Sequence, residues 1–127
     1  MQQILIMGKR KDKTAKLEEI IIEAIGERKG KNIFSIDFSG QPHSMCKKFI
    51  ICQGDSVTHV KSIADSVEVF VKKKLKENPW KKEGMDNALW ILLDYVDIVV
   101  HIFRPDIRDY YKLESLWGDN ISTNYSV

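Results

Sequence analysis

The stretch from residue 88 to residue 103 constrains the fold most strongly, because it contains two strand-like runs separated by a very short connection. Both runs are rich in branched aliphatic and aromatic side chains, and Asp94-Tyr95-Val96-Asp97 joins them. This pattern is typical of an antiparallel hairpin. A two-residue turn at Tyr95-Val96 predicts strands over 88–94 and 97–103, with the cross-strand pairs Leu92–Val99, Trp90–His101 and Ala88–Phe103.

The two faces of this hairpin differ in chemistry. One face holds Trp90, His101 and Phe103, with Asp94 and Asp97 beside the turn. Because carboxylates are rarely buried without a partner, we expect this face to be partly accessible. Large rings inside a polar rim favour protein docking. The opposite face is purely aliphatic and is predicted to be core against helices: Leu89, Ile91, Leu93, Ile98, Val100 and Ile102.

Two alternatives to this interpretation stay open. A further helix could cover the Trp90 face, which would make Trp90 an ordinary core residue. Tyr95-Val96 is also not a favoured two-residue turn. A loop of odd length would move the side chains of one strand to the opposite face.

The rest of the chain predicts a single α/β domain with one mixed β-sheet flanked by helices. We expect a loose basic arm over 1–13, with a short strand at 3–7 as an option, an α/β domain over 14–119, and a frayed polar tail over 120–127. Within the domain the patterns predict a helix from Thr14 to Gly30, strands at 32–38 and 48–52, a helix capped by Asp55-Ser56 and broken by Asn78-Pro79, a loop over 80–87, and a last helix from Pro105 to Trp117.

Length and composition limit the class of protein. The chain has 127 residues, of which 43% are apolar and 30% are charged, as is usual for one globular domain. Apolar runs stay well short of the roughly 20 residues of a transmembrane helix. The basic block Lys9-Arg10-Lys11 follows the apolar start, which is the reverse of a secretory signal. We therefore expect a cytoplasmic protein without a membrane partner.

Charge is unevenly distributed along the chain. Residues 72–82 carry six lysines against one glutamate, a net charge of +5, whereas residues 83–119 carry three basic against eight acidic side chains, a net charge of −5. This asymmetry suits docking onto a partner of mixed charge. A solvated lysine-rich helix end is the simpler interpretation. An RNA-binding module would use the same lysines, although Trp80 is the only stacking ring among them.

The turn Gly54-Asp55-Ser56 lies between a predicted strand and a helix N-terminus, where an anion can bind. It faintly resembles the Gly-Ser turn of nucleotidyltransferases. Those enzymes need a pair of metal-binding carboxylates on the strand that follows, and this chain has none in the right place. A helix-capping turn is therefore the simpler interpretation, and a nucleotidyltransferase-like enzyme is kept as an alternative.

Other catalytic and metal sites lack support. His101 has no serine or cysteine near it on the predicted face, which argues against nucleophilic catalysis. Cys46 and Cys52 would lie too far apart along one strand for a disulfide. We expect no enzyme activity, cofactor or metal site, because the candidate zinc ligands match no usual spacing: His43, Cys46, Cys52 and His59.

Several segments together resemble the ribosomal silencing factor family (RsfS, also called Iojap). The strongest match is WILLDYVDIVVHIF over 90–103, followed by RDYYKLESLW over 108–117. Further matches are FIICQGDS over 49–56, VKSIAD over 60–65 and Glu83-Gly84. The likeness runs from about Thr14 to Asp119. Two positions depart from the family pattern: Lys47, where an acidic residue is usual, and Val96, where glycine is common.

The resemblance implies a nucleotidyltransferase-like fold without the catalytic residues. It also implies binding to the fourteenth protein of the large ribosomal subunit (L14) at the subunit interface, which blocks joining of the small subunit and lowers translation when nutrients are scarce. Contact with ribosomal RNA would be secondary, and the free protein could form a homodimer. We expect Trp90, His101 and Phe103 at the centre of the partner-binding site, with a polar rim of Lys82, Glu83, Asp94 and Arg108.

Overall fold

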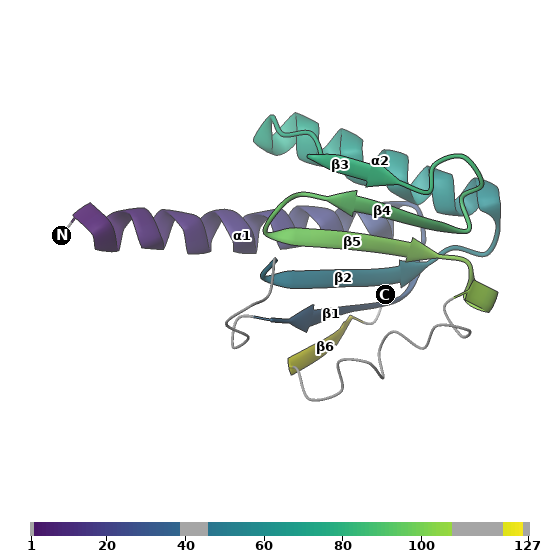
Figure 1. Ribbon diagram of the computed structural model, residues 1–127, viewed down its shortest axis with the longest axis horizontal. Coiled ribbons are helices and arrows are strands. Elements are labelled where there is room, and N and C mark those ends of the chain that lie inside the picture. The colour runs from purple at the N-terminus through teal and green to yellow at the C-terminus, as the bar shows by residue number, and fades with distance from the viewer. Residues whose placement is uncertain (1, 39–45, 108–120, 126–127) are drawn as a thin grey trace.

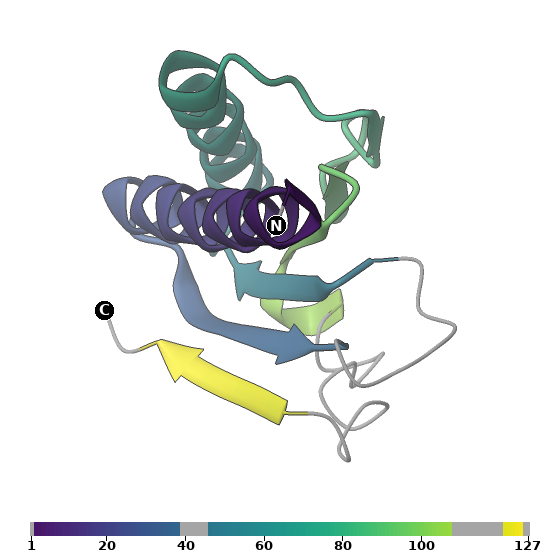
Figure 2. The ribbon, with the colours of Figure 1, turned by 90° about the vertical axis from the view of Figure 1, so that its left-hand side faces the viewer.

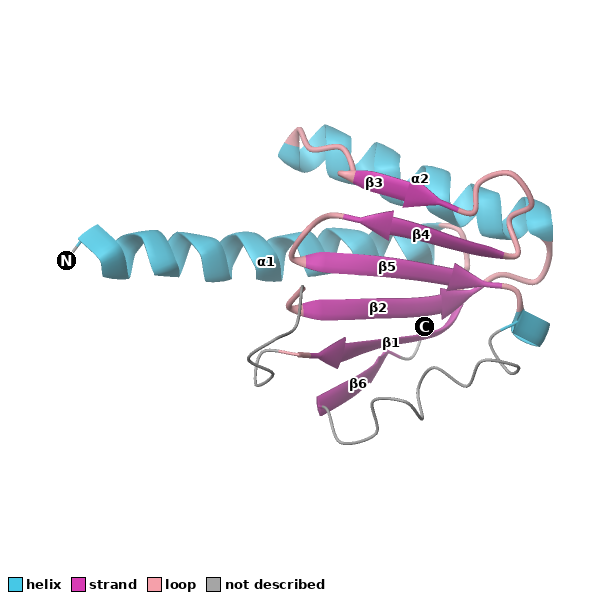
Figure 3. Cartoon of the chain, in the orientation of Figure 1, coloured by secondary structure: helices cyan, strands magenta, loops and turns pink. Residues whose placement is uncertain are grey.

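The computed structural model describes residues 2–38, 46–107 and 121–125, and in these residues the chain forms a six-stranded mixed sheet with two helices (Figure 1, Figure 3). The strand order is β3-β4-β5-β2-β1-β6, and every neighbouring pair is antiparallel except β2 and β5. The expected single α/β domain with a mixed sheet is confirmed. Its elements are α1 (Gln2–Glu27), β1 (Lys31–Asp37), β2 (Lys48–Gln53), α2 (Val57–Leu75), β3 (Lys81–Glu83), β4 (Trp90–Asp94), β5 (Ile98–Phe103) and β6 (Ile121–Tyr125).

Both helices lie on the same side of the sheet (Figure 2). Apolar side chains recur at helical spacing along each helix and pack on the aliphatic face of the strands, as the sequence predicted. Lys48 of β2 pairs with Glu18 of α1 at 2.6 Å, which ties the sheet to this layer. The buried residues that form this core include Leu17, Ile21 and Ile25 of α1, Val60, Ile63 and Val67 of α2, and Ile50, Ile91, Leu93, Val100 and Ile102 of the strands.

The N-terminal segment differs from the prediction. Residues 2–13 belong to α1 and form neither a loose arm nor a short strand. The first turns of this helix extend beyond the end of the sheet (Figure 1). Thr14 is therefore inside the helix, where its hydroxyl donates to Asp97 at 3.2 Å. The basic block Lys9-Arg10-Lys11 suggested a loose arm, but lysine and arginine are good helix formers, and α1 continues through them and through Gly8.

Two strands were not predicted. The expected loop over 80–87 contains the edge strand β3, which pairs with β4, and the expected polar tail contains β6, which pairs with β1. Both strands lie at sheet edges and are short or polar, so their sequences lack the apolar alternation of a half-buried strand. The predicted final helix begins as one helical turn over 105–107. Its remaining residues, 108–117, lie outside the described part of the chain.

Gly84, which follows β3, has a φ angle of +80°. A Cβ atom at this position would lie 1.9 Å from the backbone oxygen of Trp90. Only glycine fits both the backbone conformation and this close approach. The Glu83-Gly84 pair therefore allows the edge strand to turn back beside the start of β4.

The hairpin of β4 and β5 has the predicted faces but a different register. Trp90 pairs with Phe103, and His101 pairs with Leu92, so the register is displaced by two residues. The three predicted pairs Leu92–Val99, Trp90–His101 and Ala88–Phe103 are thus wrong. Ala88 lies in the helix-side core before β4 begins. An even displacement keeps the side chains within β4 and β5 on their predicted faces, because the side-chain period of a strand is two.

The turn explains the displacement. The Tyr95 N–H donates to the Ile98 carbonyl at 2.9 Å, which leaves Val96 and Asp97 as the two loop residues. Val96 has a φ angle of +75°, a conformation that two-residue hairpin turns require and that β-branched residues strongly disfavour. Asp94 compensates in part, since its Oδ1 atom accepts from the Val96 N–H at 2.8 Å.

Replacing Val96 with glycine should stabilise the protein by about 1 kcal/mol, because relief of backbone strain exceeds the entropy that glycine adds to the unfolded chain. Val96 is 58% exposed, so little apolar burial is lost. Urea unfolding would measure the change. Val69→Gly is the matched control, since it removes an equally exposed valine from inside α2 and should destabilise. Equal destabilisation by both changes would contradict strain at Val96.

Candidate protein-binding face

The sheet face opposite the helices carries an aromatic cluster, defined here as Phe38, Phe49, Trp90, His101 and Phe103. The ring of Phe49 lies 4.8 Å from Phe38 and 4.4 Å from His101, measured between centroids. Trp90 lies 4.8 Å from Phe103 and 5.9 Å from His101. These tilted and edge-on contacts are the favoured geometries of aromatic pairs. The cluster therefore forms a continuous layer, which begins at Phe38 just after β1 and crosses β2, β5 and β4.

Trp90 and His101 are joined by a hydrogen bond. The indole Nε1–H of Trp90 donates to Nδ1 of His101 at 3.1 Å. Because an indole nitrogen only donates, Nδ1 must be unprotonated, and the proton of the neutral imidazole is on Nε2. The bond fixes the plane of the Trp90 ring relative to the sheet. The N–H group of the indole is thus engaged within the protein.

The pKa of His101 is lowered to about 4. Desolvation by burial is the cause, because the low-dielectric surroundings disfavour the charged imidazolium. Nε2 of His101 is also buried without a hydrogen-bond partner among the described residues. The imidazole is accordingly held neutral at physiological pH, where it acts as an acceptor for Trp90.

The accessibility predicted for the three central rings is correct only in part. His101 is 4% exposed and Phe103 is fully buried, so neither ring offers a surface to a partner. Both belong to a second core layer with Phe34, Ile36 and Ile51. Trp90 is half-buried and remains the accessible ring of the three. When many rings lie on one sheet face, the inner rings are buried by their neighbours. The residue types on the face did not reveal this burial.

Of the four predicted rim residues, the structure places two on the aromatic face. Asp94 pairs with Val99 in the register of this face, and Glu83 of β3 pairs with Leu92. Lys82 does not belong to the rim, because it alternates to the helix side and pairs with Glu68 of α2 at 3.1 Å. The fourth predicted residue, Arg108, lies outside the described residues.

Phe49 and Leu92 are partly exposed on the same face and were not predicted as site residues. Phe49 comes from β2, which pairs with β5 in a parallel arrangement. Neighbours in sequence predict a hairpin well, but a parallel pair joins strands that are distant in sequence. The available signal was that Phe49 and Ile51 share a face of β2 opposite Ile50, but this did not reveal which strand would lie beside β2.

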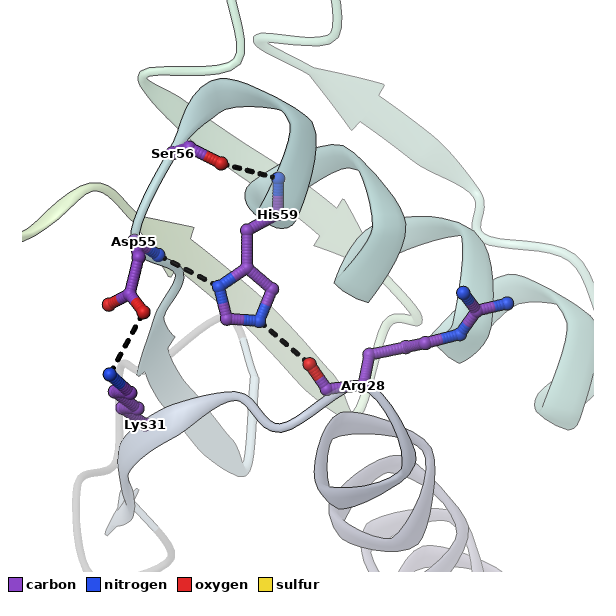
Figure 4. A network of polar contacts seen from close by, with 5 residues as sticks. All are labelled: Arg28, Lys31, Asp55, Ser56 and His59. Atoms are coloured by element: carbon purple, nitrogen blue, oxygen red, sulfur yellow. Dashed lines mark hydrogen bonds and ion pairs between the residues drawn. The ribbon is translucent and has the colours of Figure 1, made fainter.

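The turn considered as an anion site is a closed helix cap (Figure 4). Ser56 is the N-cap of α2, and its hydroxyl accepts from the His59 N–H at 3.1 Å. Nδ1 of His59 accepts from the Asp55 N–H at 2.8 Å, and Nε2 donates to the Arg28 carbonyl at 2.7 Å. The Asp55 carboxylate pairs with Lys31 at 2.9 Å. The carboxylate and the occupied N–H groups favour the capping interpretation over a phosphate site.

The candidate zinc ligands do not converge in the described part of the chain. No group of three or more histidine, cysteine, aspartate or glutamate side chains comes together there. His59 is engaged in the cap of α2, Cys52 is buried in the helix-side core, and His43 lies outside the described residues. Burial raises the pKa of the Cys46 thiol to about 11, which keeps it protonated. None of the described helices is long and apolar enough to cross a membrane.

These features define a small α/β domain with helices on one sheet face and an aromatic cluster on the other. The sequence profile described as "Ribosomal silencing factor during starvation" matches residues 11–126. The chain therefore belongs to the ribosomal silencing factor family, as the resemblance in its motifs indicated.

Individual relatives agree with this assignment. Ribosomal silencing factor RsfS of Chromobacterium violaceum is 40% identical over 105 residues, which cover 80% of this chain and 82% of that protein. RsfS of Bacillus subtilis is 38% identical over 104 residues, with 80% and 84% covered. A crystal structure of a Chromobacterium violaceum protein has a TM-score of 0.77 and 38% identity, with 82% and 85% covered.

A more distant relative carries a different name. The mouse protein "Mitochondrial assembly of ribosomal large subunit protein 1" is 32% identical over 71 residues. These residues cover 54% of this chain and 31% of the mouse protein. The shared segment thus forms a minor part of that longer chain.

Proposed function

We propose that this protein silences ribosomes without catalysing a reaction, by binding the large subunit through the face that carries Trp90. Membership of the ribosomal silencing factor family supports the proposal most directly. The name of the mouse relative supports a large-subunit partner. In this proposal the protein binds L14 in the cytoplasm and prevents the small subunit from joining the large subunit. Translation is thereby lowered under nutrient limitation.

The geometry of the aromatic cluster supports protein docking. Trp90 is half-buried and held by His101 and Phe103, so little side-chain entropy is lost when a partner covers it. Phe49 and Leu92 add partly exposed apolar surface, and Asp94 and Glu83 provide polar groups at the edge. An apolar centre with a polar rim is the usual composition of an interface hot spot.

The proposal is tested by subunit joining. Purified large subunits are incubated with the protein, mixed with small subunits, and separated on a sucrose gradient. The fraction of joined ribosomes should fall as the protein concentration rises, and the protein should sediment with large subunits. Incubation of the protein with small subunits alone is the control and should give no co-sedimentation. Protein that travels with fully joined ribosomes, without lowering their fraction, would contradict steric blocking.

A further inference from the structure

We infer that a second surface, separate from the aromatic cluster, binds single-stranded RNA. It consists of Lys72, Lys73 and Lys76 at the end of α2, together with Trp80 just before β3, and is called the Lys-Trp surface. The backbone N–H of Trp80 donates to the Asp94 carbonyl at 2.7 Å, which places this surface at the end of β4 opposite Trp90. Two tryptophans thus occupy opposite ends of the β3–β4 unit.

Trp80 is unusually exposed for its size. Its relative exposure of 76% is the highest among the large apolar side chains of the described residues. The hydrogen bond to Asp94 fixes its backbone, and the exposed Val96 lies beside Asp94 in the same turn. The structure therefore presents a solvent-exposed indole ring on an anchored backbone, four residues after Lys76 in the sequence. Such rings serve as stacking platforms for nucleobases.

Ion pairs neutralise some of the nearby lysines but not all of them. Lys74 pairs with Glu23 at 2.9 Å, Lys82 pairs with Glu68, and Lys81 pairs with Glu83. Glu77, the only acidic residue of the basic segment, is occupied by Lys13. In the described segment 72–82, three exposed lysines have no carboxylate partner: Lys72, Lys73 and Lys76.

The combination of free lysines and an exposed planar ring favours RNA over other anionic partners. Phosphate groups would pair with the charged lysine side chains, and bases would stack on the indole whatever the RNA sequence. An acidic protein would use the lysines but has no need of the ring. An anionic membrane would require a broad apolar helix face beside the charges, whereas α2 buries its apolar face in the core. If the proposed function holds, an unpaired loop of ribosomal RNA would be the natural ligand.

The inference is tested with the full chain and a fluorescently labelled, unstructured oligoribonucleotide of about 12 residues, a length that spans one typical single-strand site. Binding is followed by anisotropy at several salt concentrations. Changing Lys72, Lys73 and Lys76 together to glutamine should lower affinity at least tenfold and reduce the salt-dependence slope by about 2, at roughly 0.7 per phosphate contact. Trp80→Ala should weaken binding roughly 5- to 100-fold with an unchanged slope.

A matched control changes three exposed lysines elsewhere, Lys16, Lys29 and Lys61, to glutamine. Equal losses in both triple variants would overturn the inference, because binding would then follow net charge alone. Absence of RNA binding at low salt would also overturn it. If polyglutamate competed as well as RNA and Trp80→Ala left RNA binding unchanged, the surface would be assigned to an acidic protein instead.

The RNA experiment can be separated from the proposed function. Trp90→Ala should leave oligoribonucleotide binding unchanged, since Trp90 lies outside the Lys-Trp surface. Absence of RNA binding by the parent protein, with its blocking of subunit joining intact, would refute this inference alone. Failure of subunit blocking with intact RNA binding would refute the proposed function alone.

Discussion

Trp90→Ala should weaken binding to the large ribosomal subunit at least about 30-fold, which corresponds to roughly 2 kcal/mol for a central aromatic anchor. The substitution removes one of the two partly exposed rings of the aromatic cluster and leaves Nδ1 of His101 without its donor. Co-sedimentation with purified large subunits over a range of protein concentrations measures the dissociation constant. The loss should appear as an equal rise in the concentration needed to block subunit joining.

Two control variants separate binding from folding. Trp90→Phe keeps an aromatic ring and should retain most of the affinity, although it loses the hydrogen bond to His101. Val69→Ala shortens an exposed apolar side chain on α2 and should bind like the parent protein. Thermal melts must show that all three variants fold. A folded Trp90→Ala protein that binds large subunits as tightly as the parent would remove Trp90 from the binding site.

Acidification should destabilise the protein through His101. In the unfolded chain the imidazole has a pKa near its usual value of 6.5, and in the folded protein the pKa is about 4. The unfolded state therefore binds the proton more readily, and stability is lost as the pH falls from about 6.5 to about 4. The size of this loss is about 3 kcal/mol, and it levels off below the folded pKa.

The contribution of His101 can be isolated with His101→Asn, whose side-chain oxygen can accept from Trp90 but does not titrate. Urea unfolding at pH 7.5, 6, 5 and 4 would give the free energy of unfolding for both proteins. The variant starts less stable because it loses ring packing, yet the difference between the two proteins should shrink on acidification. A constant difference at every pH would show that His101 is protonated with equal ease in both states.

The sequence predicted the aliphatic core and the faces of β4 and β5, because the periodicity within both strands is strong. It failed for Ala88 and Leu89, which precede β4. The cap of α2 was also predicted, since Ser56 has a local capping role that needs no distant partner. The register of the hairpin was wrong by two residues. Nothing in the local pattern favours a valine at positive φ, so the loop was placed at Tyr95-Val96 in place of Val96-Asp97.

The candidate site was predicted less completely than the core. Trp90 and Asp94 were placed on the correct face, and each depends only on alternation within one strand. Phe49 was missed, and His101 was expected to be accessible, because both outcomes depend on the parallel pairing of β2 with β5. The partner-binding role of each residue stays a prediction until the variants above are measured.

The parallel pair of β2 and β5 also affects when the protein can act during its own synthesis. Phe49 and His101 touch across this pair, although they are roughly fifty residues apart in the sequence, and such long-range contacts form late in folding. A nascent chain that ends before β5 has neither the His101 support for Trp90 nor the strand beside β2. The aromatic face therefore cannot form until β5 has been synthesised.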